Sequence, residues 1–120
     1  MDIESLRQIC LSLPHATEGV QWDNDLLFRV GNKMFAVASL DITPTRVSFK
    51  CTPEKFAELI EREGITPAAY MARNHWVTLH RLDALEEKET ENLIRESYAM
   101  VWAKLTKKLR IELNEGAGRV

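Results

Sequence analysis

The first thirteen residues show the hydrophobic periodicity of an amphipathic α-helix. Apolar side chains recur there at intervals of three and four positions, at Ile3, Leu6, Ile9, Cys10 and Leu13. Asp2 stands where a side chain can cap the helix N-terminus, and Pro14 prevents the helix from continuing. The pattern predicts a helix over residues 2–13 whose apolar stripe packs on another element.

Between Glu18 and Lys50 the hydrophobic period changes to two, which is typical of β-strands. We predict a short strand that carries Val20 and Trp22, and further strands over residues 26–30, 33–40 and 46–50. The third strand is apolar at both parities, which indicates a central position. Gly31 and Asn32 tolerate positive φ and indicate a tight turn. Because the connections are short, the four strands are expected to form an antiparallel meander.

The second half of the chain predicts two more helices and one more strand. Thr52 is placed to cap a helix that begins at Pro53 and ends near Gly64. Residues 66–74 are expected to form a loop, and residues 75–82 a strand. One continuous helix is expected from residue 86 to about residue 110, with an apolar face formed by Ile94, Tyr98, Val101, Trp102, Leu105 and Leu109.

Together these elements predict a single α+β domain over residues 1–113 and a flexible tail over residues 114–120, which contain two glycines. We expect an antiparallel sheet of about five strands, with the helices packed on one face and water on the other. The alternation of Val47 and Phe49 with Arg46, Ser48 and Lys50 agrees with a sheet that is covered on one side.

Composition and charge restrict where the protein works and how it can meet nucleic acid. Hydrophobic residues make up 45% and charged residues 28% of the 120 residues, as in ordinary soluble domains. Apolar runs such as 34–40 are too short to span a bilayer, and the acidic start differs from a secretory signal. We therefore expect a cytoplasmic protein. Because the net charge is −2, any contact with nucleic acid requires a local basic patch.

Residues that often carry chemistry do not form a recognisable motif in this sequence. Cys10 and Cys51 are far apart and are interpreted as reduced packing residues. His75 and His80, five positions apart on a strand, would point to opposite faces and could not share a metal ion. No phosphate-binding loop, nucleophile elbow or zinc-protease motif occurs. We expect no enzymatic activity, no metal and no cofactor.

Several short segments in the chain carry a family resemblance. They are Leu13-Pro14, Thr17-Glu18, Phe28-Arg29-Val30-Gly31-Asn32-Lys33-Met34-Phe35-Ala36, Phe49-Lys50-Cys51 before Pro53-Glu54, Asn74-His75-Trp76 and Ser97-Tyr98. In this order, over residues 6–110, they resemble the MmcQ/YjbR-like family. The resemblance implies a frataxin/CyaY-like fold and the double-wing mode of DNA binding that has been proposed for that family. It implies no shared reaction and no catalytic residue.

Two sets of basic residues are candidates for phosphate contacts. Arg29, Lys33, Arg46 and Lys50 belong to the meander, and Lys104, Lys107, Lys108 and Arg110 belong to the end of the last predicted helix. Both sets have plainer interpretations. Basic residues alternate on any wet sheet face for solubility, and cations at a helix C-terminus complement the helix dipole. Asp23, Asp25 and Asp41 near the meander would repel phosphate.

Three functional hypotheses follow from the sequence. The leading one is a small DNA-binding protein that contacts mainly phosphates through these basic residues. The alternative is a protein-interaction module that presents the open sheet face, including Arg29, Arg46 and Lys50, to a protein partner. A third hypothesis is a small-ligand binder lined by Trp22, Trp76 and Tyr70, although tryptophans of small domains belong more often to the core. The oligomeric state is not determined by the sequence.

Overall fold

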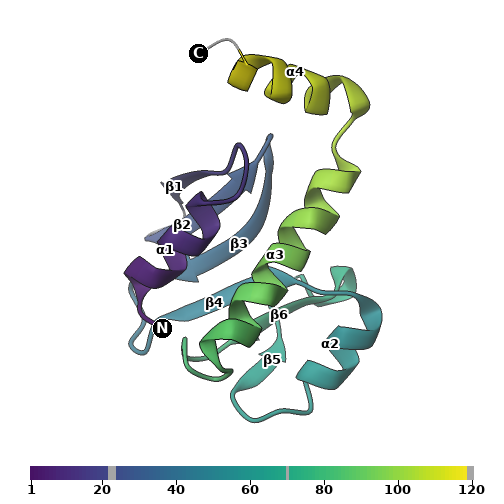
Figure 1. Cartoon of the computed structure of the whole chain (residues 1–120). Coiled ribbons are helices and arrows are strands. Elements are labelled where there is room, and N and C mark those ends of the chain that lie inside the picture. Colours follow the sequence, from purple (N-terminus) through teal and green to yellow (C-terminus); the bar gives the residue numbers. More distant parts are fainter. Residues whose placement is uncertain (22–23, 70, 119–120) are drawn as a thin grey trace.

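The computed structural model describes residues 1–21, 24–69 and 71–118, and the side chains up to residue 115. Trp22 and Tyr70 lie outside the described residues. The elements follow the predicted α+β order with two additions (Figure 1). They are α1 (Ile3–Leu11), β1 (Thr17–Gln21), β2 (Asp25–Val30), β3 (Lys33–Ser39), β4 (Arg46–Lys50), α2 (Pro53–Leu59), β5 (Ile65–Pro67), the 3₁₀ helix η1 (Ala72–Asn74), β6 (Trp76–Leu79), α3 (Glu87–Lys104) and α4 (Lys107–Gly118).

The local signals for the helix starts are confirmed. The Asp2 carboxylate accepts a hydrogen bond from the Ser5 N–H at 2.8 Å and caps α1. The Thr52 hydroxyl accepts one from the Lys55 N–H at 3.2 Å and caps α2, which begins with Pro53. These caps satisfy backbone donors that a helix cannot satisfy itself, so they fix where each helix begins.

The strands form one antiparallel sheet in the order β1-β2-β3-β4-β6-β5. The position of β3 inside the sheet confirms its prediction as a central strand. The sixth strand, β5, was expected to be a loop, and that expectation is wrong. Ile65 is buried opposite Leu79, and β5 lies at the edge of the sheet, where Pro67 is tolerated.

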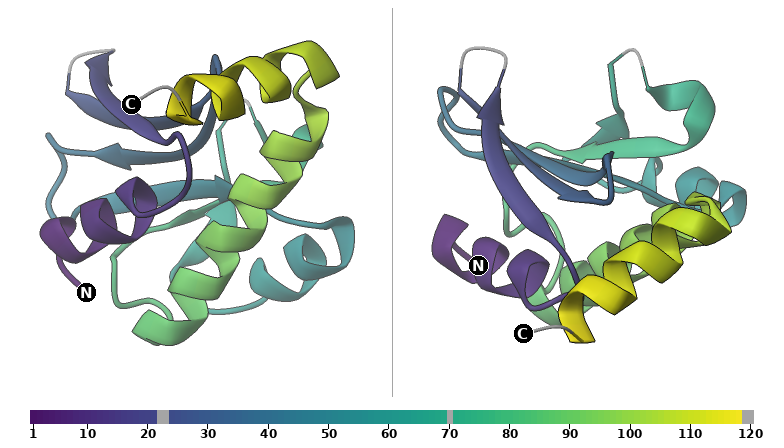
Figure 2. Two further views of the ribbon diagram at one scale, coloured as in Figure 1. Left: turned by 45° about the horizontal axis from the view of Figure 1, so that its top comes forward. Right: turned by 90° about the horizontal axis from the view of Figure 1, so that it is seen from above.

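The helices α1, α3 and α4 lie on one side of the sheet, as predicted (Figure 2). Val47 and Phe49 point into the core on that side and are fully buried. Arg46, Ser48 and Lys50 alternate with them and remain half-buried on the other side. The period-two pattern therefore identified the core face of β4.

The other face of the sheet is not left entirely to water, which corrects the expectation of a bare surface. Four residues on that side, Leu27, Val37, Ala68 and Trp76, form a second buried cluster. Ala68 comes from the segment between β5 and β6, which rises on this side of the sheet (Figure 2). Trp76 is 6% exposed and is a core residue of this cluster. The open face is therefore partly walled.

The long helix predicted over residues 86–110 is two helices. Leu105 is extended (ψ 151°) and ends α3, and the Thr106 hydroxyl accepts a hydrogen bond from the Leu109 N–H at 3.1 Å. The chain bends because this bend buries Leu105 against the core. Residues 114–118, expected to belong to a loose tail, continue α4 as a helix.

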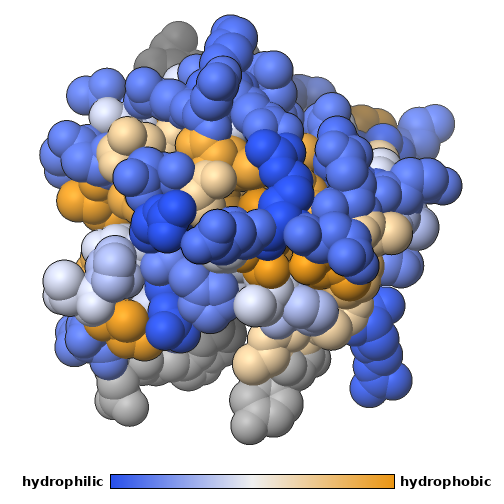
Figure 3. Space-filling model, turned by 90° about the horizontal axis from the view of Figure 1, so that it is seen from below, coloured by the Kyte–Doolittle hydropathy of each residue, from blue (hydrophilic) through white to orange (hydrophobic). Residues whose placement is uncertain are grey.

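The surface offers little that is apolar on a large scale. In the view of Figure 3, hydrophobic residues show in scattered patches between hydrophilic side chains. The large hydrophobic residues that are exposed, Leu11, Val20, Leu40, Ile42 and Ile111, come from different elements and loops. Within the described residues, none of the helices combines the length and apolar character needed to cross a membrane.

Candidate nucleic-acid interface

The position of Lys50 is set by a hydrogen bond between the sheet and α3. The pairing of β3 with β4 ends at Ala36 and Phe49. Beyond that pair, the Ser97 hydroxyl donates to the Phe35 carbonyl oxygen at 2.7 Å and accepts from the Lys50 N–H at 3.0 Å. Ser97 is fully buried. Its hydroxyl thus joins the two strand ends to the helix and holds Lys50 beside α3.

Three lysines from different elements converge at this point. Lys33 begins β3, Lys50 ends β4 and Lys104 ends α3. Burial, the adjacent Lys104 ammonium and then the Lys33 ammonium lower the pKa of Lys50. Since like charges raise the free energy of the protonated state, the direction of this shift agrees with close approach of the three side chains. Lys33 and Lys104 are exposed, so the cluster faces solvent.

The lysines line two adjoining cavities. One, of about 530 Å³, is lined by Lys50, Cys51, Thr52, Pro53, Arg73, Asn74, His75, Met100, Ala103 and Lys104. The other, of about 370 Å³, is lined by Lys33, Met34, Lys50, Asn74, Trp76, Val101 and Lys104. Both share Lys50, Asn74 and Lys104, and none of these lining residues is acidic. We call Lys33, Lys50, Asn74 and Lys104 the lysine groove.

The lysine groove differs from the other basic positions in its lack of counter-ions. Elsewhere, cations form ion pairs with carboxylates, as Arg7, Lys55, Arg62, Arg81, Lys88 and Arg95 do. In the part of the chain that the structure describes, Lys33, Lys50 and Lys104 form none. Glu96 precedes Lys104 by eight residues, which places it about 12 Å away along the helix axis. The groove is therefore a local positive site on an acidic protein.

The remaining predicted residues do not join the groove. Arg29 donates a hydrogen bond to the Gln21 side chain at 2.9 Å, toward β1. Arg46 begins β4 and thus lies about 13 Å along the strand from Lys50. The break after α3 places Lys107, Lys108 and Arg110 on a different helix from Lys104. The expected single run of four cations on one helix is wrong for this reason.

Sequence reasoning missed Asn74, Arg73 and His75 as site residues. Asn74 lines both cavities, and Arg73 and His75 line the larger one. Residues 72–74 form η1, and His75 follows in the left-handed conformation (φ 63°) that turns the chain into β6. Asn74 and His75 belong to the Asn74-His75-Trp76 segment that supported the family resemblance, and that segment was the available signal.

The histidines and cysteines have structural surroundings. His15 stacks on Trp102 and hydrogen-bonds to the Asn114 side chain at 2.9 Å. His80 hydrogen-bonds to the Thr66 hydroxyl at 2.7 Å, and the His75 ring packs edge-on against Phe56. The described residues contain no group of three or more potential ligands placed to hold a metal ion.

Comparisons with known proteins assign the chain to a family. A model of the YjbR family matches residues 11–100. The crystal structure of a Deinococcus radiodurans protein with a DUF419 domain is 34% identical, covers 94% of this chain and 88% of that chain, and has a TM-score of 0.84. A Pseudomonas syringae protein, 22% identical with a TM-score of 0.69 over 84% of this chain and 99% of its own, has a similar fold. The search of curated proteins gave no match. The chain therefore belongs to the YjbR family.

Proposed function

We propose that this protein binds DNA through phosphate contacts centred on the lysine groove, and that it does so without catalysis. The observation that supports the proposal is the convergence of Lys33, Lys50 and Lys104 along two cavities whose described lining residues carry no carboxylate. Phosphate oxygens are the acceptors that clustered lysines bind in nucleic acids.

The empty groove is electrostatically unfavourable, which favours an anionic partner. Two like charges about 4 Å apart repel by on the order of 1 to 4 kcal/mol at a protein surface, depending on the local dielectric. The lowered pKa of Lys50 reflects this repulsion together with burial. A phosphate between the ammonium groups would replace repulsion by attraction. The plainer interpretation, complementation of the α3 dipole, accounts for Lys104 but not for Lys33 and Lys50, which come from the sheet.

Lys107, Lys108 and Arg110 act in this proposal as outer contacts. The turn between β2 and β3, next to Lys33, packs against Leu105 and Leu109 at the bend between α3 and α4. The first residues of α4 therefore flank the hairpin that carries Lys33. With a net charge of −2, the contact is confined to this corner, so the affinity is expected to be moderate and to fall steeply with salt.

A charge-matched pair of variants tests the proposal. One variant carries Lys33→Gln, Lys50→Gln and Lys104→Gln, and the control carries Lys55→Gln, Lys88→Gln and Arg95→Gln, whose cations already form ion pairs. Fluorescence anisotropy with a labelled duplex measures affinity against salt concentration. We expect the groove variant to lose up to about 0.9 from the logarithmic salt slope per lost phosphate contact, and the control to lose little.

Equal losses in both variants would show that net charge alone governs binding and would remove the groove from the proposal. The protein-interaction alternative is separated by a pull-down with and without nuclease. A defined protein partner that remains after nuclease treatment, and that the groove variant still binds, would count against DNA as the partner.

A further inference from the structure

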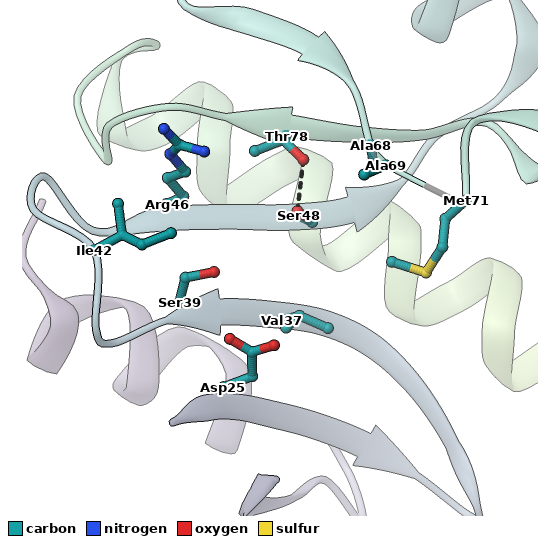
Figure 4. A pocket seen from close by; sticks show the side chains of 10 residues that line it. All are labelled: Asp25, Val37, Ser39, Ile42, Arg46, Ser48, Ala68, Ala69, Met71 and Thr78. Carbon is teal, nitrogen blue, oxygen red and sulfur yellow. Dashed lines mark hydrogen bonds between the residues drawn. The ribbon is translucent and has the colours of Figure 1, made fainter. Parts of the chain in front are cut away.

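A third cavity lies on the open face of the sheet, toward the opposite end of β4 from the lysine groove. Its volume is about 400 Å³, within the range of about 300 to 1,000 Å³ that is typical of small-molecule sites. Its side chains come from β2, β3, β4, β6 and the segments after β3 and β5 (Figure 4). They are Asp25, Val37, Ser39, Ile42, Arg46, Ser48, Ala68, Ala69, Met71 and Thr78.

One part of this cavity is apolar. Val37 and Ala68 belong to the second buried cluster and are 8% and 3% exposed. Met71 packs against the same cluster and lies at the end of the cavity away from Arg46 (Figure 4). Ile42 adds an exposed apolar side chain near Arg46. This wall suits the hydrocarbon body of a ligand, because burial of apolar surface is its main source of affinity.

Hydroxyl groups lie between the apolar wall and Arg46. Ser48 and Thr78 face each other across the pairing of β4 with β6, and their hydroxyl oxygens are 2.8 Å apart. Ser39 pairs with Arg46 across β3 and β4 and lies on the same face. Each hydroxyl has capacity for more than one hydrogen bond. They can therefore orient an oxygen of a bound molecule.

Arg46 provides the charged group of the cavity. Its Nε atom is buried and has no hydrogen-bond partner among the described residues. An unpaired buried donor is unfavourable, and on a cation it is more so. Nε and the neighbouring Nη present two parallel N–H donors that match the two oxygens of a carboxylate. A carboxylate at this edge would satisfy the buried donor in a way that a single neutral acceptor would not.

Asp25 limits the charge that the cavity accepts. Its carboxylate projects from β2, across β3 from Arg46 (Figure 4). A second negative charge on the ligand would meet this group in a partly enclosed space, where repulsion is screened poorly. The arrangement therefore favours one carboxylate over two.

We propose that this cavity binds a small monocarboxylate, with its carboxylate paired to Arg46 and its apolar body against Val37, Ala68 and Met71. The site is separate from the lysine groove and does not depend on DNA binding. It also differs from the small-ligand hypothesis drawn from the sequence, which invoked Trp22 and Tyr70, outside the described residues, and Trp76, which does not line this cavity.

Titration of the ¹⁵N-labelled protein with hexanoate tests the site, with hexanamide and adipate as matched probes. We expect saturable shifts of the backbone amides of Val37, Ser48 and Thr78 with hexanoate, at least tenfold weaker binding of hexanamide, and weaker binding of adipate. Arg46→Met is expected to weaken hexanoate at least tenfold, and Arg46→Lys several-fold because a lysine lacks the paired donors. Asp25→Asn is expected to strengthen adipate more than hexanoate.

Arg29→Gln serves as the control, because Arg29 lies on the same sheet face outside the cavity and binds Gln21. Its hexanoate affinity should equal that of the wild type, and dispersed spectra establish that each variant is folded. The proposal is wrong if hexanoate and hexanamide bind equally, if hexanoate produces no saturable shifts at these amides, or if folded Arg46→Met and Arg46→Lys both retain wild-type affinity.

Discussion

Gly31, in the turn between β2 and β3, lies in direct packing distance of Leu105, at the bend between α3 and α4. A Cβ atom at position 31 would lie 3.1 Å from Leu105 Cδ2 and the same distance, 3.1 Å, from Leu109 Cδ2. The turn also requires a positive φ of 63° at Gly31. A glycine is needed here for both its conformation and its small size. The close approach joins the hairpin that carries Lys33 to the helix end that carries Lys104.

Gly31→Ala is therefore expected to lower the free energy of unfolding by about 1 to 3 kcal/mol, from the left-handed backbone and the crowding of two leucines. Chemical denaturation measures the change. Gly19→Ala is the control, because a Cβ there meets no atom within 4 Å and the φ of Gly19 is not positive. Equal stability of the two variants would contradict the packing described for Gly31.

Ser97→Ala is expected to destabilise the protein by about 1 to 3 kcal/mol, because it leaves the Lys50 N–H and the Phe35 carbonyl without their shared partner. Asn92→Ala, an exposed position on the same helix, should change stability by less than about 0.5 kcal/mol. Thermal and urea unfolding check both. A neutral Ser97→Ala would mean that this hydroxyl is not needed to join α3 to the sheet.

The affinity for DNA should fall as pH rises through the lowered pKa of Lys50. Only the protonated ammonium attracts phosphate, and a bound phosphate favours that form, so binding takes up a proton in this range. Anisotropy between about pH 7 and 10 measures the effect, which covers the range below the ordinary lysine pKa. Lys50→Arg should show a flatter profile, since a guanidinium stays protonated. Identical profiles would exclude Lys50 as the titrating group.

Charge reversal of Lys107 and Lys108 together should lower DNA affinity, but by less per charge than Lys104→Glu. Lys104 lines both cavities of the groove, whereas Lys107 and Lys108 lie on α4 and line neither. Anisotropy at low salt compares the two variants. A larger effect per charge from α4 would place the main phosphate contact on that helix.

The two cysteines should react slowly with thiol reagents in the native protein. Burial, with a smaller contribution from Glu18, raises the pKa of Cys10 to about 12, and burial, followed by Glu96, raises the pKa of Cys51 to about 12. Because only the thiolate reacts, we expect labelling at about pH 8 to be on the order of 100-fold or more slower than in guanidinium. Release of thionitrobenzoate from a disulfide reagent measures the rate. A fast native phase would contradict the burial of one thiol.

Local sequence signals predicted most of the fold because they depend on neighbouring residues. Asp2 and Thr52 identified two helix starts, since capping is a contact over three residues. The alternation of β4 identified its core face, since strand geometry alone sends neighbouring side chains to opposite sides. The edge strand β5 was missed because Pro67 and a length of three residues hide the periodicity that identifies longer strands.

The candidate sites were predicted only in part. Lys33, Lys50 and Lys104 were identified as separate basic residues, but nothing in their spacing shows that two strand ends and a helix end meet. Arg46 was assigned to the same patch as Lys50 because both alternate onto one face of β4. The structure separates them, and it places Arg46 in a cavity with residues from β2, β3, β6 and the segment after β5.

The sequence by itself determined the composition of the elements: which residues cap helices, which strand face is apolar, and that the last helical region is amphipathic. Tertiary structure decided the bend at Leu105, the covering of the open face around Trp76, and the grouping of the cations. The physical reason is the range of the interactions. Caps and periodicity act over a few residues, whereas burial and charge repulsion depend on side chains that are distant along the chain and meet only after folding.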